Sequence, residues 1–219
     1  TRGHPAHVWL ARVGASTAFN SIRRSTSSRP FDSRNRPAVA GRDGLSRPRS
    51  ITHHNIKVGA VISLERMLRH MAWSNQYVLH FLQELPDEAL AAYVVNPEWH
   101  VERIITHTVG AASWYCYRLN GQDFGDISIP TTMADLADLA ELAQRVDAVL
   151  LREAEETDRL MKHVNEEGEV LRWRSTILSQ AVHHATEHRA QLACALEARG
   201  FPAPDLDEID LWAFEILNG

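Results

Sequence analysis

The chain has 219 residues, enough for one domain with a sizeable hydrophobic core. Its charge is uneven, because residues 1–50 carry +8 and residues 51–219 carry −13. The acidic part argues against nucleic acid as the main partner. Two cysteines are too few for a disulfide framework, which suits a reducing compartment, and no apolar run approaches the roughly 20 residues that span a bilayer. We therefore expect a soluble, cytoplasmic protein.

Residues 1–50 are rich in Ser, Arg, Pro and Gly and have little apolar periodicity outside a short patch at Val8–Val13. Such a segment buries too little surface to offset its ordering entropy, so we expect a disordered basic tail. Its arginine and serine bias is also typical of an organelle transit peptide. Because the chain begins at Thr1 and its first methionine is Met67, we favour a tail or translated upstream sequence over targeting. A nucleic-acid-binding arm is the weakest alternative.

Residues 51–219 are predicted to form one all-α domain, a four-helix bundle with a short C-terminal cap helix. The first helix is expected over about residues 63–85, where apolar residues recur at three- and four-residue steps until Pro86. Asn96-Pro97-Glu98 predicts the start of the second helix, with the asparagine as its N-cap. Asn120-Gly121 predicts its end.

The third helix is expected from residue 131 or 132 to about residue 162, with Asp135 in a capping box. A turn at residues 165–169 separates flanks that are long enough only for a small hairpin. The fourth helix is predicted over about residues 175–200, with a glycine at its C-terminus. A final short helix is expected over residues 207–217.

The predicted fourth helix contains His184 and His188. Four residues apart on an α-helix, they lie about 40° apart and one turn along, so both rings can reach one ion. Bundle cores build metal sites from facing helices, and His107 lies on the apolar stripe of the second helix between Ile104 and Ala111. We predict that the three histidines hold one divalent metal ion and leave a fourth position to water or substrate, as catalytic sites do.

Other side chains fit this site less well. His183 points about 100° away from the adjacent member of the pair and is interpreted as a flanking residue. His70 and His100 are candidates for supporting groups, although packing or exposure explains both. Cys116 and Cys194 lie off the two histidine stripes and are interpreted as small core residues.

The segment His184–His188 also matches His-x-x-Glu-His, the inverted zinc-peptidase motif whose glutamate acts as a general base. Peptidases with this motif take a third, acidic ligand from far downstream, whereas only 31 residues follow His188 here. The fold signals also differ from that class. We therefore reject the peptidase interpretation.

Several short motifs occur in a defined order. They are His70–Asn75; Ile105–His107 with Ser113-Trp114 and Leu119–Gly121; and His184–Gln191 with Leu196, Gly200 and Asp205–Asp207. Together they resemble the DinB/YfiT-like superfamily over about residues 60–215, most strongly in the His-x-x-x-His-Arg-x-Gln block. The resemblance implies a four-helix bundle in which His107, His184 and His188 bind zinc or nickel. Ala190 stands where many members have glycine.

The resemblance also implies a homodimer and, in some subfamilies, a thiol S-transferase that uses a low-molecular-weight thiol. The first hypothesis is therefore an enzyme whose metal, preferably zinc, binds the thiol as a thiolate and directs it toward a small electrophile. Arg189 or Glu187 could orient an anionic cofactor, but we interpret both as plain exposed helix residues. The alternative is a non-catalytic, metal-stabilised module for small-molecule binding or stress response. The sequence assigns no catalytic or cofactor-binding residue.

Overall fold

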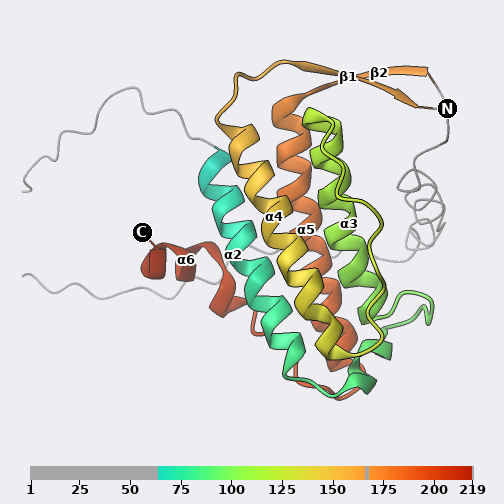
Figure 1. The fold of residues 1–219 in the computed structure, drawn as a ribbon. Helices are drawn as coiled ribbons and strands as arrows, with labels where there is room; N and C mark the ends of the chain where they lie inside the picture. Colours follow the sequence, from blue (N-terminus) through green and yellow to red (C-terminus); the bar gives the residue numbers. More distant parts are fainter. Residues whose placement is uncertain (1–63, 166–167, 219) are drawn as a thin grey trace, which may run out of the picture. The chain divides into compact units, whose positions relative to one another are not determined.

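The structure is a computed structural model that describes residues 64–165 and 168–218 (Figure 1). The described residues form α2 (Leu64–Gln83), α3 (Val101–Asn120), α4 (Leu136–Ala154), β1 (Leu160–Asn165), β2 (Gly168–Trp173), α5 (Arg174–Glu197) and α6 (Leu211–Asn218). Short 3₁₀ turns lie at η2 (Asp87–Ala91), η3 (Met133–Asp135) and η4 (Asp207–Ile209). The prediction of a helical bundle with a short C-terminal helix is confirmed. The predicted tail at residues 1–50 and the domain boundary at residue 51 lie outside the described residues.

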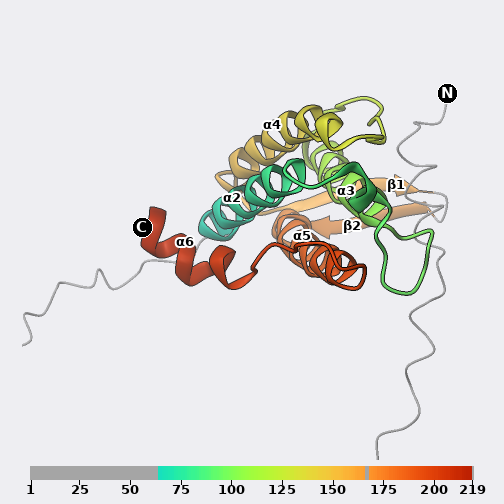
Figure 2. The same ribbon diagram turned by 90° about the horizontal axis from the view of Figure 1, so that it is seen from below.

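The four long helices pack side by side, with α2 and α5 running in one direction and α3 and α4 in the other (Figure 1). At the C-terminal ends of α3 and α4, Asn120 Nδ2 donates to Glu153 Oε1 at 2.9 Å. Before α4, the Met133 N–H donates to the Asp87 carboxylate at 2.7 Å, near the start of α3. The segment 121–132 therefore runs back along the length of the bundle and connects α3 to α4, which are parallel. Figure 2 shows α2 beside α4 and α3 beside α5.

The faces that the helices turn toward one another are apolar. Leu68, Ile104, Leu150, Leu192 and Leu196, drawn from all four long helices, are each at most 1% exposed. Burial of each such side chain stabilises the fold by about 1.5–3 kcal/mol relative to exposure. Packing of these faces therefore holds the bundle together, and it encloses two polar clusters.

The second helix begins at Val101, four residues later than predicted. The Asn96 carbonyl accepts the Trp99 N–H at 2.9 Å, and the Asn96 side-chain oxygen accepts the Glu98 N–H at 3.0 Å. Asn96 and Pro97 thus open a turn rather than a helix, a role that Asn-Pro suits equally well. The predicted cap at Asn96 and the placement of His100 inside the helix were wrong, because His100 is the N-cap residue.

The third helix ends at Ala154, well before the predicted residue 162, and the chain continues into the hairpin. Each strand has six residues, so the hairpin is longer than predicted. Asp158 lies between helix and strand and accepts the Ser175 N–H at 3.0 Å and the Ser175 hydroxyl at 2.8 Å, which caps α5. Leu160, inside the predicted helix, lies in β1 instead and is 46% exposed.

The helix ends differ in how well the sequence predicted them. The capping box of Thr132 and Asp135 is confirmed before α4. After α5, Gly200 has φ of +77° and the Phe201 N–H donates to the Leu196 carbonyl at 3.1 Å, a Schellman motif. The final predicted helix is divided into η4 and α6, because the Asp210 carboxylate accepts the N–H of Ala213 and starts a new helix there.

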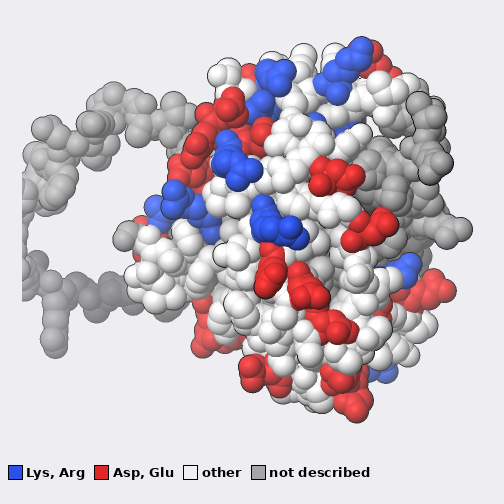
Figure 3. Space-filling view, viewed as in Figure 1, with Lys and Arg blue, Asp and Glu red and all other residues white. Residues whose placement is uncertain are grey.

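Within the described part of the chain, no helix has both the length and the apolar character needed to cross a bilayer. Figure 3 shows acidic and basic side chains interspersed on the face where α2 and α4 lie. The basic groups that the structure describes form no continuous patch on that face.

Candidate metal centre

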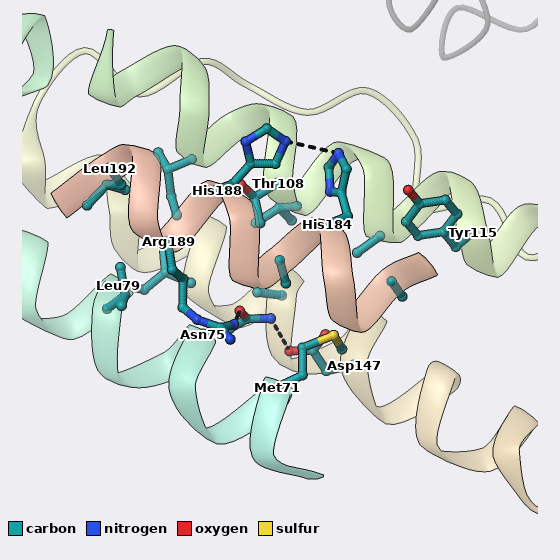
Figure 4. A pocket seen from close by; sticks show the side chains of 17 residues that line it. Met71, Asn75, Leu79, Thr108, Tyr115, Asp147, His184, His188, Arg189 and Leu192 are labelled. Atoms are coloured by element: carbon teal, nitrogen blue, oxygen red, sulfur yellow. Dashed lines mark hydrogen bonds between the residues drawn. The ribbon is translucent and has the colours of Figure 1, made fainter. Parts of the chain in front are cut away.

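Three histidine side chains meet between α3 and α5. Nε2 of His184 lies 3.0 Å from Nε2 of His107 and 3.0 Å from Nε2 of His188. All three potential ligand atoms lie within 4.8 Å of one another. The four-residue spacing places the two α5 rings on one face of the helix, the face toward α3 in Figure 4. The structure thus brings together the three residues that the sequence singled out.

Two of the three nitrogen separations are close to those around a tetrahedral ion. Zinc–nitrogen bonds of about 2.0–2.1 Å at tetrahedral angles require nitrogen atoms about 3.3 Å apart. The nitrogen pairs at 3.0 Å would need to separate by only a few tenths of an ångström. Among the described residues the group has three members, so an ion held there would keep a position for a further ligand.

Burial keeps the three rings neutral at physiological pH. Desolvation, followed by charge repulsion from His188, lowers the pKa of His107 to about 4. Desolvation, followed by repulsion from the other two rings, lowers the pKa of His184 to about 3. Burial also lowers the pKa of His188, although its contact with Gln191 opposes the change. Neutral imidazole is the form that binds a metal ion.

Gln191 fixes the protonation of His188. Oε1 of Gln191 accepts the indole N–H of Trp99 at 3.0 Å and lies 2.9 Å from Nδ1 of His188. The indole nitrogen can only donate, so the shared atom is the amide oxygen, which carries no hydrogen. Nδ1 of His188 must therefore carry the proton, and the lone pair on its Nε2 points to the cluster. Bonds of this kind set the tautomer and the ring orientation of metal-binding histidines.

Two aromatic side chains pack against the cluster. The Trp99 ring centroid lies 5.3 Å from that of His107 and 5.7 Å from that of His188. The Tyr115 ring lies 5.9 Å from His184, and burial raises the pKa of its hydroxyl, which therefore stays protonated at neutral pH. Neither aromatic residue was predicted from the sequence to lie at the site.

A second polar cluster lies on another side of α5 (Figure 4). Arg189 follows His188 directly and so points about 100° away from it. Its Nη1 donates to Asn75 Oδ1 at 2.8 Å, and Asn75 Nδ2 donates to Asp147 Oδ2 at 3.2 Å. Arg189 is 7% exposed and Asp147 is 3% exposed. The interpretation of Arg189 as an exposed helix residue was therefore wrong.

The charges of this second cluster are opposed by burial and supported by each other. Desolvation raises the pKa of Asp147 to about 7, against the effects of the Asn75 amide and the Arg189 charge. Desolvation lowers the pKa of Arg189 to about 10, so the guanidinium stays protonated at neutral pH. A cavity of about 20 Å³ is lined by these three residues and by His184 and His188. It has room for about one water molecule between the clusters.

His70, His100 and His183 do not belong to the group of three histidines. His183 is exposed, as expected for a flanking residue. His70 is buried against η4, where its Nε2 donates to the Ile209 carbonyl at 2.8 Å. His100 lies at the start of α3 with its Nδ1 3.3 Å from the Glu102 carboxylate. His70 and His100 therefore support the fold rather than the cluster.

The two cysteines have different surroundings. Cys116 is completely buried, as predicted, and burial raises the pKa of its thiol to about 12. Cys194 is exposed, so its interpretation as a core residue was wrong. Glu187 is exposed, as predicted.

Fold and site together define a four-helix bundle with a largely buried group of three histidines that could hold a metal ion. A family model described as the DinB family matches residues 57–215. The chain belongs to the DinB family, which confirms the resemblance drawn from its motifs. The comparisons with curated proteins and with solved structures give no match.

Proposed function

We propose that His107, His184 and His188 bind one divalent metal ion, with zinc favoured over nickel, in a thiol S-transferase that acts on small electrophiles. The observation that carries this proposal is the convergence of three neutral rings, one of which Gln191 holds with its lone pair toward the others. A divalent cation is a suitable partner for imidazole nitrogens that meet in this way. Zinc suits both imidazole and sulfur ligands and has no redox chemistry of its own.

When bound, zinc would supply the Lewis acidity that lowers the pKa of a low-molecular-weight thiol, so that the thiol binds as a thiolate. Gln191 would keep the His188 ring in place, and Trp99 would limit the access of water. In the transfer, the thiol sulfur forms a bond to the electrophilic carbon. The leaving group departs with the electron pair of the bond that breaks, and the thiol proton passes to solvent.

The alternative is a non-catalytic module in which the ion stabilises the bundle and a small molecule binds beside it. The cluster joins residues of α3 and α5 that lie 77 positions apart, so an ion there would cross-link two helices, which supports this alternative. The homodimer stays a prediction under either proposal.

The metal site is tested by measuring the metal content of the full chain by mass spectrometry. We expect one equivalent of divalent metal in the wild type and loss of most of it in His107→Ala, His184→Ala and His188→Ala. His183→Ala is the matched control, because that residue lies on the same helix and is exposed. Circular dichroism should show similar helix content in all variants, since apolar packing supplies most of the stability. Variants that keep their metal would refute the site.

The reaction is tested by incubating the metal-loaded protein with thiols and electrophiles and following the thioether product by mass. Turnover that depends on the metal and on His188 supports the transferase. Tight metal binding without turnover for any thiol would favour the binding module instead.

A further inference from the structure

An open apolar groove lies beside the histidine cluster, between the segment 94–99 and α5. Its volume is about 380 Å³, which is in the range of sites for small organic ligands. It is lined by Val94, Val95, Asn96 and Trp99 of the segment, by Ile104 of α3, and by two alanines, Gln191 and Cys194 of α5. None of the described residues that line it is charged. The lining therefore suits an uncharged, apolar ligand.

The loop that forms one wall of the groove is held in place. The Arg199 Nε donates to the Tyr93 carbonyl at 2.9 Å, and its guanidinium lies 3.7 Å from the centre of the Tyr93 ring. The Val101 N–H donates to the Ala92 carbonyl at 2.9 Å. Anchored on both sides, the loop nevertheless leaves Val94 51% exposed and Val95 85% exposed. Apolar side chains exposed at the edge of a groove are typical of a ligand site.

Two residues belong to both the groove and the metal-binding cluster. Trp99 lines the groove and packs against the rings of His107 and His188. Gln191 lines the groove and holds the Nδ1 proton of His188. A ligand in the groove would therefore lie one side chain away from the histidines.

We infer that this groove binds the apolar part of the ligand whose reactive end reaches the histidine cluster past Trp99. The ligand class is a small organic molecule with an uncharged aliphatic or aromatic body and a thiol or electrophilic carbon at one end. This inference rests on the proposed function, because it identifies what the metal site acts on. It also predicts that affinity depends on the apolar length of the ligand.

The test titrates the cobalt-loaded protein with straight-chain alkanethiols of two to eight carbons under reducing conditions. The sulfur-to-cobalt absorption band measures binding. We expect affinity to rise about two- to fourfold for each added methylene group, because each one leaves water for the groove. Cys194→Phe fills the groove from an exposed position and should abolish this rise, whereas Cys194→Ser should keep it.

Two further variants distinguish the groove from other apolar surface of the protein. Val95→Asp places a charge at the groove edge on a side chain that is 85% exposed, so it should weaken octanethiol binding without affecting folding. Trp212→Ala removes an exposed apolar side chain of α6, outside the groove, and should leave the rise unchanged. The same rise in wild type and Cys194→Phe, or no rise in cobalt-loaded wild type, would overturn the inference.

Failure of cobalt to bind would refute the metal site rather than the groove. The groove is then decided in metal-free protein by displacement of N-phenyl-1-naphthylamine, an uncharged apolar dye. Displacement by 1-octanol at lower concentration than by 1-butanol, lost in Cys194→Phe and kept in Trp212→Ala, would support the groove. Dye binding that is lost in Trp212→Ala and kept in Cys194→Phe would place the apolar site on α6 and overturn the inference.

Discussion

The two polar clusters of the bundle differ in how their groups are matched. In the cluster around Arg189, donors meet acceptors, and a guanidinium, an amide and a carboxylate form a chain across α5, α2 and α4. In the histidine cluster, three like groups face one another, with two nitrogen pairs at 3.0 Å, and burial holds the rings neutral. His188 and Arg189 are adjacent in sequence, yet they belong to different clusters.

From this difference we expect the Arg189 cluster to serve stability and the histidine cluster to serve binding. Matched charges in a core satisfy one another, so removing one partner is costly, and they leave nothing for a ligand. Like ring nitrogens that converge add little to the fold and favour an ion that comes from outside. Variants of the Arg189 cluster should therefore change the free energy of unfolding, and variants near the histidines should change metal affinity.

The largest effect is expected for Asp147→Leu. The substitution leaves the buried Arg189 guanidinium without its counter-charge, and arginine cannot lose its proton at neutral pH. We expect the free energy of unfolding to fall by about 3–5 kcal/mol at pH 8, measured by chemical denaturation. Metal content should be nearly unchanged in the folded fraction.

The double variant Asp147→Leu/Arg189→Leu is the control for this effect. Replacing both charges by apolar side chains of similar size removes the uncompensated cation and should recover much of the loss. Recovery should be incomplete, because Asn75 then loses both partners. A single variant as stable as the wild type would mean that the two charges are not coupled.

The sequence predicted the histidine cluster because its signals are local. His184 and His188 share one helix face by spacing alone, and the apolar neighbours of His107 showed that it faces the core. The buried position of Arg189 could not be predicted in this way. Because α5 packs against both α2 and α3, side chains that point about 100° apart on it can both be buried. The sequence around Arg189 gives no sign of this second buried face.

The partners of the cluster were also beyond sequence reasoning. Gln191 lies within the motif block, but its role depends on the indole of Trp99, 92 positions away. Trp99 reaches it because Asn96 and Pro97 form a turn, and the same two residues are also typical of a helix start. Side-chain contacts between distant segments decide between such local alternatives.

The second prediction concerns pH and the metal-free protein. Since folding lowers the pKa of His184 from 6.5 to about 3, the unfolded chain binds more protons between pH 6.5 and 4. Because proton uptake then favours the unfolded chain, the free energy of unfolding falls as pH falls through this window. From pH 6.5 to 4, we expect the free energy of unfolding of the wild type to fall by about 2–3 kcal/mol more than that of His184→Leu.

Denaturation curves at several pH values, with chelator present, measure this difference. Asp147 titrates in the opposite sense, because folding raises its pKa to about 7 and acid favours the folded form. Comparison with His184→Leu removes this contribution, since both proteins contain Asp147. Parallel pH profiles of the two proteins would contradict the burial of a neutral His184.

The third prediction concerns Gln191→Leu. The substitution removes the acceptor that holds the Nδ1 proton of His188, so the ring loses its fixed tautomer. We expect zinc affinity to fall about 10–100-fold, measured by competition with a chelating dye, and stability to change little. Gln191→Glu keeps the acceptor and should restore the affinity. Gln144→Leu, at an exposed position of α4, is the matched control, and an equal loss there would remove Gln191 from the site.

The smallest effect is expected for Thr186→Val. The Thr186 hydroxyl accepts a hydrogen bond from Arg189 Nη2 at 3.1 Å, but Thr186 is exposed, so water can replace it. The free energy of unfolding should therefore fall by less than about 1 kcal/mol. Asn75→Leu is the comparison, because it removes the contact on the buried side of the same guanidinium, where water has little room. It should lower the free energy of unfolding clearly more than Thr186→Val does. If the two variants cost the same, the Arg189 charge is held by solvent at the helix surface, and the distinction between a matched structural cluster and an open binding cluster fails.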